Sequence, residues 1–226
     1  MDNVNLPEAS INWFGHASFY FIDQNGNKIY FVDPFQLKDR ASEKADLIFI
    51  THAHSDHFSP DDIDEIIHSK TTVIAPPDIL EKIDIEDERK IMVEPNNDYE
   101  IKGFKFQTIP AYNNHPDKLN FHPKSNNWVG FIFELNGKKI YHAGDADFIE
   151  EMKKLKDLHL DIAMLPIGGT YTMGVEEAAR AANAIAAKTT IPMHYKNLLG
   201  GNFKQAEEKF KSLVTNSNVL ILNEIS

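Results

Sequence analysis

The segment Thr51-His52-Ala53-His54-Ser55-Asp56-His57 places three imidazoles and a carboxylate within six consecutive positions. It directly follows the apolar run Leu47-Ile48-Phe49-Ile50 and precedes Ser59-Pro60-Asp61-Asp62, whose hydroxyl, proline and acidic residues predict a helix to about Lys70. Side chains at the end of a buried strand lie in the usual crevice of an α/β protein. One histidine could merely cap the helix, but this many imidazoles have no packing use. The segment therefore predicts a metal site, since imidazole and carboxylate suit zinc and similar divalent ions.

The composition narrows the class of protein around this site. Of the 226 residues 42% are hydrophobic and 25% charged, as in an ordinary globular chain. The net charge of -11, without any basic run, repels polyanions, so we expect no nucleic-acid partner. Cysteine is absent, which excludes thiolate ligands and disulfides and suits the cytoplasm. No basic and apolar leader and no bilayer-length apolar run occur, so we expect an unexported protein without a membrane partner.

Two stretches predict β-hairpins that resemble one another. Residues 18–33 turn at Asn25-Gly26 and residues 130–145 turn at Asn136-Gly137, dipeptides that favour the positive φ angles of a tight hairpin turn. Each hairpin has an aromatic-rich first strand, a Lys-Ile-Tyr return strand and a final aspartate. The likeness indicates either two similar halves or a coincidence, because Asn-Gly hairpins are common.

The remaining pattern alternates buried strands with helices. Apolar runs too dense for inside/outside alternation predict strands covered on both faces, at 47–50, 162–165 and 219–222. Further helices are expected over about 148–156, 175–188 and 202–214. No linker or change of composition divides the chain, so we expect a single domain over residues 1–226.

The complete pattern Thr-His-x-His-x-Asp-His at Thr51–His57 resembles the signature of the metallo-β-lactamase superfamily. Other stretches resemble a branch of small, mostly uncharacterised hydrolases that are similar to the ascorbate-phosphate lactonases. These stretches are Trp13-Phe14-Gly15-His16-Ala17-Ser18, Val32-Asp33-Pro34 and Leu165-Pro166-Ile167-Gly168-Gly169-Thr170-Tyr171-Thr172-Met173. The resemblance implies an α/β fold, a four-layer αββα sandwich in which two sheets pack face to face between helices.

The resemblance also implies a dispersed set of metal ligands. In the family the first two histidines of the motif bind one metal, the aspartate and last histidine bind a second, and a later aspartate bridges both. Carried over residue by residue, the ligands are His52, His54, Asp56, His57, Asp145 in His142-Ala143-Gly144-Asp145, and His194 in Ile191-Pro192-Met193-His194. The third histidine of the first metal is expected before residue 130, where His122 matches the branch better and His115 is the alternative.

Two divalent ions, zinc first with manganese, iron or nickel as alternatives, would lower the pKa of a shared water toward about 7. Asp56 would then act catalytically by accepting a hydrogen bond from that water. His16 is interpreted as an extra ligand, a partner of a ligand or a core histidine. Asp33 either orients a ligand imidazole or caps the turn at Pro34.

These features predict a metal-dependent hydrolase that cleaves a small, anionic ester, lactone or phosphodiester. The alternatives are a nuclease or phosphodiesterase of the same fold, against which the acidic charge argues, and a non-catalytic metal-binding protein. A homo-oligomer is left open. The substrate is not identified by the sequence, because specificity in this fold lies in loops such as 112–128 and 168–173.

Overall fold

The computed structural model describes residues 5–6, 9–23, 29–38 and 40–225. The chain divides into two compact units, one formed by residues 1–93 with 222–226 and the other by residues 94–221. The single domain expected over residues 1–226 stays a prediction. Each unit contains one mixed sheet and its own helices, and none of the helices in the described ranges is long and apolar enough to cross a membrane.

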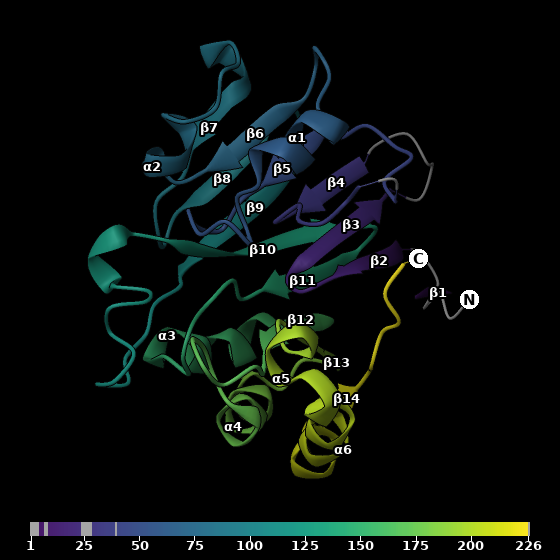
Figure 1. The fold of residues 1–226 in the computed structure, drawn as a ribbon, viewed down its shortest axis with the longest axis vertical. Helices are drawn as coiled ribbons and strands as arrows, with labels where there is room; N and C mark the ends of the chain where they lie inside the picture. The colour runs from purple at the N-terminus through teal and green to yellow at the C-terminus, as the bar shows by residue number, and fades with distance from the viewer. Residues whose placement is uncertain (1–4, 7–8, 24–28, 39, 226) are drawn as a thin grey trace. The chain divides into compact units, whose positions relative to one another are not determined.

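The first unit is built on a seven-stranded sheet whose strands follow one another in chain order. The strands are β1 Asn5–Leu6, β2 Ala9–Gly15, β3 Ser18–Ile22, β4 Ile29–Val32, β5 Leu47–Phe49, β6 Thr72–Ala75 and β7 Lys90–Met92. β1 to β4 pair antiparallel, whereas β4 to β7 pair parallel. Its helices are α1 Pro60–Ile66, α2 Pro77–Leu80 and the 3-10 helix η1 Asp87–Arg89 (Figure 1).

Helix α1 follows the loop that carries the Thr51–His57 motif, called here the motif loop, and packs into the core of this unit. Phe31, Ile48 and Val73 are successive partners in the register of β4, β5 and β6, so their side chains share one face of the sheet. Ile63 and Ile66 of α1 belong to the same buried cluster. Each such side chain contributes about 1.5–3 kcal/mol by leaving water, so the helix is anchored by its apolar face.

Helix α1 begins as the sequence predicted and ends earlier. The Ser59 hydroxyl accepts a hydrogen bond from the backbone N–H of Asp62 at 3.4 Å, and Pro60 takes the first helical position. The helix was expected to reach about Lys70, but Ile67 is already extended. The Thr71 hydroxyl accepts from the backbone N–H of His68 and donates to the Ala45 carbonyl, which diverts the backbone from the helical path.

The second unit repeats the same architecture. Its seven-stranded sheet contains β8 Asp98–Ile101, β9 Phe104–Pro110, β10 Val129–Leu135, β11 Lys138–His142, β12 Ile162–Pro166, β13 Thr189–Met193 and β14 Asn218–Val219. Helices are α3 Glu150–Lys153, α4 Val175–Ile185, α5 Lys196–Leu199 and α6 Phe203–Leu213, with 3-10 helices η2 Lys124–Asn126, η3 Lys154–Leu158 and η4 Gly200–Asn202 (Figure 1). β8 to β11 pair antiparallel and β11 to β14 parallel.

Because the order and direction of pairing agree strand by strand, the two units favour the interpretation of two similar halves. In the second hairpin Asn136 and Gly137 have φ angles of 53° and 72°, which a two-residue turn of this kind requires. The Asn25-Gly26 turn lies outside the described residues.

The structure corrects the expected bounds of one strand and two helices in the second half of the chain. The strand expected at 219–222 spans only Asn218–Val219, at the edge of its sheet, and residues from 222 onward belong to the first unit. The helix expected over 175–188 stops at Ile185, because Ala186 adopts a left-handed φ of 53° while its N–H still donates to Ala182. The helix expected over 148–156 is one α-helical turn that continues as η3.

Gly130 supplies a test of the close approach between β10 and β11. A Cβ added there would lie 2.7 Å from the His142 carbonyl oxygen and 2.9 Å from that of Ala143. We expect Gly130→Ala to lower the free energy of unfolding in urea by about 1–3 kcal/mol through overpacking. Gly201→Ala is the matched control, because a Cβ there meets nothing within 4 Å. Equal stability of the two variants would contradict the close approach.

Candidate metal centre

The motif loop of the first unit starts where β5 ends and folds back on itself. The backbone N–H groups of His57 and Phe58 both donate to the His54 carbonyl oxygen, at 3.0 and 2.8 Å. This turn buries His52 and His57, while His54 and Asp56 remain partly exposed. The loop therefore presents its histidines from a rigid backbone.

Asp33, the residue after β4, holds this loop. Its Oδ1 accepts from the Thr51 backbone N–H at 2.8 Å, and its Oδ2 accepts from the Thr51 hydroxyl and from His57 Nδ1, both at 2.7 Å. The carboxylate is fully buried. Of the two interpretations of Asp33, the structure shows the contact expected of a residue that orients an imidazole.

These contacts determine which imidazole nitrogens carry protons. Since the Thr51 hydroxyl donates to Asp33, it accepts from His52 Nδ1, which lies 2.9 Å away. His57 Nδ1 likewise donates to Asp33. Both rings therefore keep a proton on Nδ1, and in the neutral form their Nε2 atoms carry the lone pair that a metal ligand needs.

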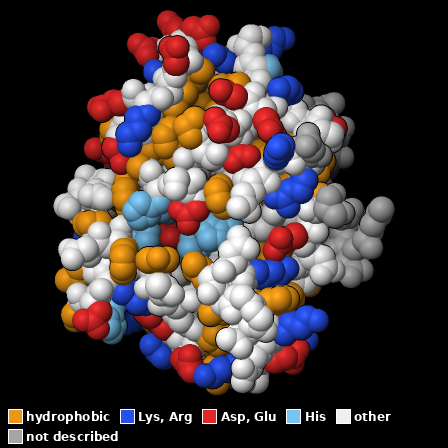
Figure 2. Space-filling model, in the orientation of Figure 1, with side chains coloured by type: hydrophobic (Ala, Val, Ile, Leu, Met, Phe, Trp, Pro, Cys, Tyr) orange, Lys and Arg blue, Asp and Glu red, His pale blue; other side chains and the backbone are white. Residues whose placement is uncertain are grey.

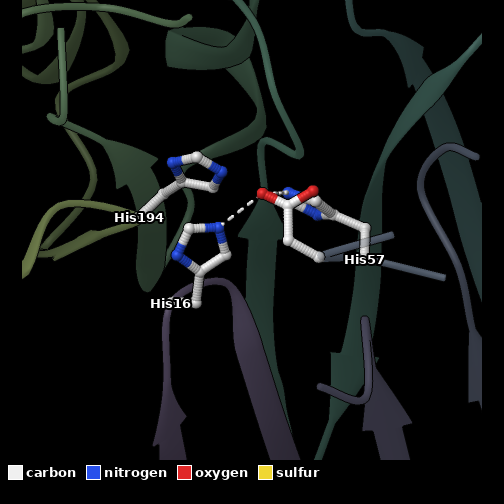
Figure 3. A group of neighbouring side chains, drawn as sticks. His16, His57 and His194 are labelled. Carbon is white, nitrogen blue, oxygen red and sulfur yellow. Dashed lines mark hydrogen bonds and ion pairs between the residues drawn. The ribbon is translucent and has the colours of Figure 1, made fainter. Parts of the chain in front are cut away.

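The ligand atoms of the motif lie close together within this unit. His52 Nε2 is 3.1 Å from His54 Nδ1. Asp56 Oδ2 is 2.8 Å from His16 Nε2 and 4.0 Å from His57 Nε2. Dashed lines mark these interactions at the labelled His16 and His57 in Figure 3. Imidazole and carboxylate donors of this kind are the ligands that divalent ions such as zinc prefer.

His16 joins the motif from the turn between β2 and β3. It has a φ of 51°, and its carbonyl oxygen accepts from Trp13 Nε1 at 3.1 Å. Its side chain is 7% exposed and contacts Asp56. The structure thus shows His16 as a partner of Asp56, and its role as an additional ligand stays a prediction.

The second unit carries its own convergence, centred on Asp145. His122 Nε2 and His194 Nε2 lie 3.3 and 3.1 Å from the same oxygen, Asp145 Oδ2. All three side chains are almost completely buried. Asp145 follows β11, and His194, also labelled in Figure 3, follows β13 with a φ of 57°. Two nitrogens and a carboxylate oxygen at these distances fit a zinc-like ion.

The two candidates for the third histidine are in different surroundings. His122 faces Asp145, whereas the His115 side chain is 55% exposed and its Nδ1 is 3.8 Å from the exposed Asp117 carboxylate. The structure therefore brings His122, and not His115, to the aspartate. Its role as a ligand stays a prediction.

The sequence did not connect Asn113 or Gly168 with the ligand histidines. Asn113 Oδ1 is 2.8 Å from His122 Nδ1. Gly168 lets the His194 backbone pass close by, because a Cβ there would lie 2.3 Å from the His194 carbonyl oxygen. No local signal marks Asn113, because its contact with His122 depends on the path of the loop between them.

Comparison with known proteins agrees with this chemistry. The family model described as a β-lactamase superfamily domain matches residues 10–194. A UPF0173 metal-dependent hydrolase of Thermococcus onnurineus is 33% identical over 95% of this chain and 96% of its own length. A UPF0173 metal-dependent hydrolase of Pyrococcus abyssi is 35% identical over 91% of this chain and 92% of its own length. A crystal structure of a candidate metal-dependent hydrolase from Parabacteroides distasonis has a TM-score of 0.81 and 30% identity, covering 96% of this chain and 93% of that one.

The fold and the His/Asp donor sets define a metal-dependent hydrolase with the metallo-β-lactamase fold. The chain belongs to the β-lactamase superfamily, among the UPF0173 metal-dependent hydrolases. The α/β fold and the enzyme class predicted from the sequence are confirmed. The likeness to the ascorbate-phosphate lactonases stays a prediction.

Replacement of Asp33 tests the orientation of the motif. The Asp33 carboxylate accepts hydrogen bonds from all of its donors. The amide of Asp33→Asn would instead turn an N–H toward either Thr51 or His57. We expect zinc affinity to fall by about 10–100-fold, as is usual when the partner of a ligand imidazole is lost. Competition with a chromogenic chelator measures it. Asp61→Asn, at an exposed position in α1, is the control, and a parental affinity in Asp33→Asn would contradict the assignment.

Proposed function

We propose that this protein hydrolyses a small, anionic ester, lactone or phosphodiester with a metal-activated water. The observation that carries the proposal is the pair of imidazole nitrogens, from His122 and His194, that face one buried carboxylate oxygen of Asp145. A divalent cation suits three such atoms, because it balances the carboxylate charge and accepts the nitrogen lone pairs. Membership of a family named for metal-dependent hydrolysis supports the same conclusion.

We further propose that this chain binds two divalent ions. The proposal rests on the superfamily motif and on the arrangement of the donors inside each unit. The ligands would be His52, His54, Asp56, His57, His122, Asp145 and His194. Zinc is the preferred ion for this nitrogen and oxygen set, and Mn²⁺, Fe²⁺ and Ni²⁺ accept it as well.

A bound divalent ion would lower the pKa of a water and stabilise the oxyanion or leaving group. The chain's own residues would supply orientation and a proton acceptor. Asp56 is 36% exposed, so its carboxylate reaches solvent while His16 holds its Oδ2. It would accept a hydrogen bond from the attacking water. Asp33 would keep His57 in the tautomer that leaves Nε2 for the metal.

The choice of a small molecule over nucleic acid rests on charge. The net charge is -11, and on the face shown in Figure 2 Lys and Arg side chains are interspersed with Asp and Glu. A continuous basic surface, which phosphate-backbone binding needs, is not what this face offers. A cytoplasmic location belongs to the same proposal, in keeping with the absence of cysteine, and homo-oligomer formation stays a prediction.

Replacement of His54 tests whether metal content and hydrolytic activity depend on the same site. We expect His54→Ala to lower zinc content and hydrolysis together, because His54 is a proposed ligand next to His52. The measurements are elemental analysis and initial rates on a panel of esters, lactones and phosphodiesters. His159→Ala, at an exposed histidine, is the control. Unchanged metal content in His54→Ala would sink the ligand assignment.

A pair of variants tests whether His122 or His115 is the third histidine ligand of the first metal. We expect His122→Ala to weaken zinc binding by at least about 10-fold, and His115→Ala to leave it unchanged because that side chain is exposed. Titration of both metal-free variants with zinc measures the difference. The reverse pattern would transfer the role to His115.

Removal of the metal tests the enzyme itself. We expect a chelator to abolish hydrolysis and added Zn²⁺ or Mn²⁺ to restore it. A metal-loaded protein that cleaves RNA in preference to every small ester would favour the nuclease. One that cleaves no member of the panel would favour the non-catalytic metal-binding protein.

A further inference from the structure

The carboxamide of Asn113 joins three segments of the second unit. Its Oδ1 lies 3.0 Å from the His122 backbone nitrogen and 2.8 Å from His122 Nδ1. Its Nδ2 lies 2.9 Å from the Tyr171 carbonyl oxygen. The Asn113 backbone N–H also donates to the His122 carbonyl at 2.9 Å. The residue is 2% exposed, so these contacts are shielded from water.

The orientation of this carboxamide follows from its partners at both ends. A backbone N–H can only donate, so the atom that faces the His122 nitrogen must be the amide oxygen. A backbone carbonyl can only accept, so the atom that faces Tyr171 must be the amide nitrogen. The two ends therefore agree on one orientation and exclude the flipped one.

This orientation determines the tautomer of His122. Because Oδ1 can only accept, His122 Nδ1 must carry a proton and donate it. In the neutral ring the lone pair is then on Nε2, the atom 3.3 Å from Asp145 Oδ2. A ring with the opposite tautomer would turn a lone pair toward the amide oxygen, which is unfavourable in a buried site.

We propose that Asn113 is a positioning residue that prepares His122 for metal binding and, with the same amide, holds the loop that carries Tyr171. The proposal rests on the proposed role of His122 as a ligand. Tyr171 is 39% exposed and its ring meets that of Phe121, the neighbour of His122, edge to face at 4.9 Å. One buried amide thus connects a ligand with an exposed aromatic pair.

Other contacts keep this region folded when the Asn113 side chain changes. Asp147, fully buried, accepts from the backbone N–H groups of Asn114 and His115 at 3.0 Å each. Lys118 Nζ donates to the Thr172 carbonyl at 2.5 Å and lies 3.4 Å from Asp147. These bonds tie the two loops together independently of Asn113, so its variants report on His122 rather than on unfolding.

Two substitutions distinguish the contact of the amide oxygen with His122 from that of the amide nitrogen with Tyr171. Asn113→Leu removes both the acceptor and the donor at similar volume, whereas Asn113→Asp keeps the acceptor for His122 and loses the donor to Tyr171. We expect Asn113→Leu to weaken zinc affinity by about 10–100-fold, the usual effect of losing the partner of a ligand imidazole. We expect Asn113→Asp to retain the parental affinity while hydrogen exchange around Tyr171 becomes faster.

A second readout observes the imidazole directly. In the metal-free protein, with the ring neutral, the nitrogen-15 shifts of His122 should show the proton on Nδ1 in the parent and in Asn113→Asp. In Asn113→Leu that preference should disappear. Asn114→Leu is the matched control, because Asn114 is exposed and its Nδ2 donates to the Phe148 carbonyl. It should change neither the zinc affinity nor the His122 spectrum.

Loss of the positioning role and loss of the ligand role of His122 give different results. If His122→Ala weakens zinc binding but Asn113→Leu does not, the positioning role is wrong and the ligand assignment stands. If Asn113→Asp loses as much affinity as Asn113→Leu, Asn113 is merely structural. If His122→Ala itself keeps the parental zinc affinity, both the ligand assignment and the role of Asn113 are overturned.

Discussion

The fully buried carboxylate of Asp33 is the constraint on which the motif depends. An isolated carboxylate is costly to bury, and this one is stabilised by hydrogen bonds from the Thr51 backbone, the Thr51 hydroxyl and His57. These bonds join the end of β4 to the loop after β5, which are neighbouring strands of one sheet. Without them the loop could adopt other conformations, and its histidines would lose both their direction and their tautomer.

Three residues of the candidate metal centre have a strained backbone conformation. Asp33, His16 and His194 have φ angles of 46°, 51° and 57°, which side-chain-bearing residues seldom adopt. Each such conformation costs on the order of 1–3 kcal/mol and persists only when its surroundings impose it. For Asp33 and His16 the imposing contacts are those to His57 and Asp56. The contacts of these two residues thus offset the cost of their backbone conformations.

The two units use different groups for the same purpose. A carboxylate, Asp33, accepts from His57 Nδ1, and a carboxamide, Asn113, accepts from His122 Nδ1. The carboxylate can satisfy three donors, whereas the amide exchanges part of that capacity for a donor to the Tyr171 carbonyl. Since the strand pairings of the two sheets match, this difference lies in the loops, which are the part of the fold that sets specificity.

The sequence by itself determined the features that depend on neighbouring residues. These are the ligand types of the Thr51–His57 motif, the start of α1 at Ser59 and the Asn136-Gly137 turn, because caps, turns and short motifs act over a few positions. Only the tertiary structure decided the contact of His16 with Asp56, 40 positions apart, the position of His122 beside Asp145, and the contact of Asn113 with His122. Those contacts depend on strand register and on the path of loops, which no local pattern records. The end of α1 belongs to the same group, since a hydroxyl bonded to a distant carbonyl stops the helix.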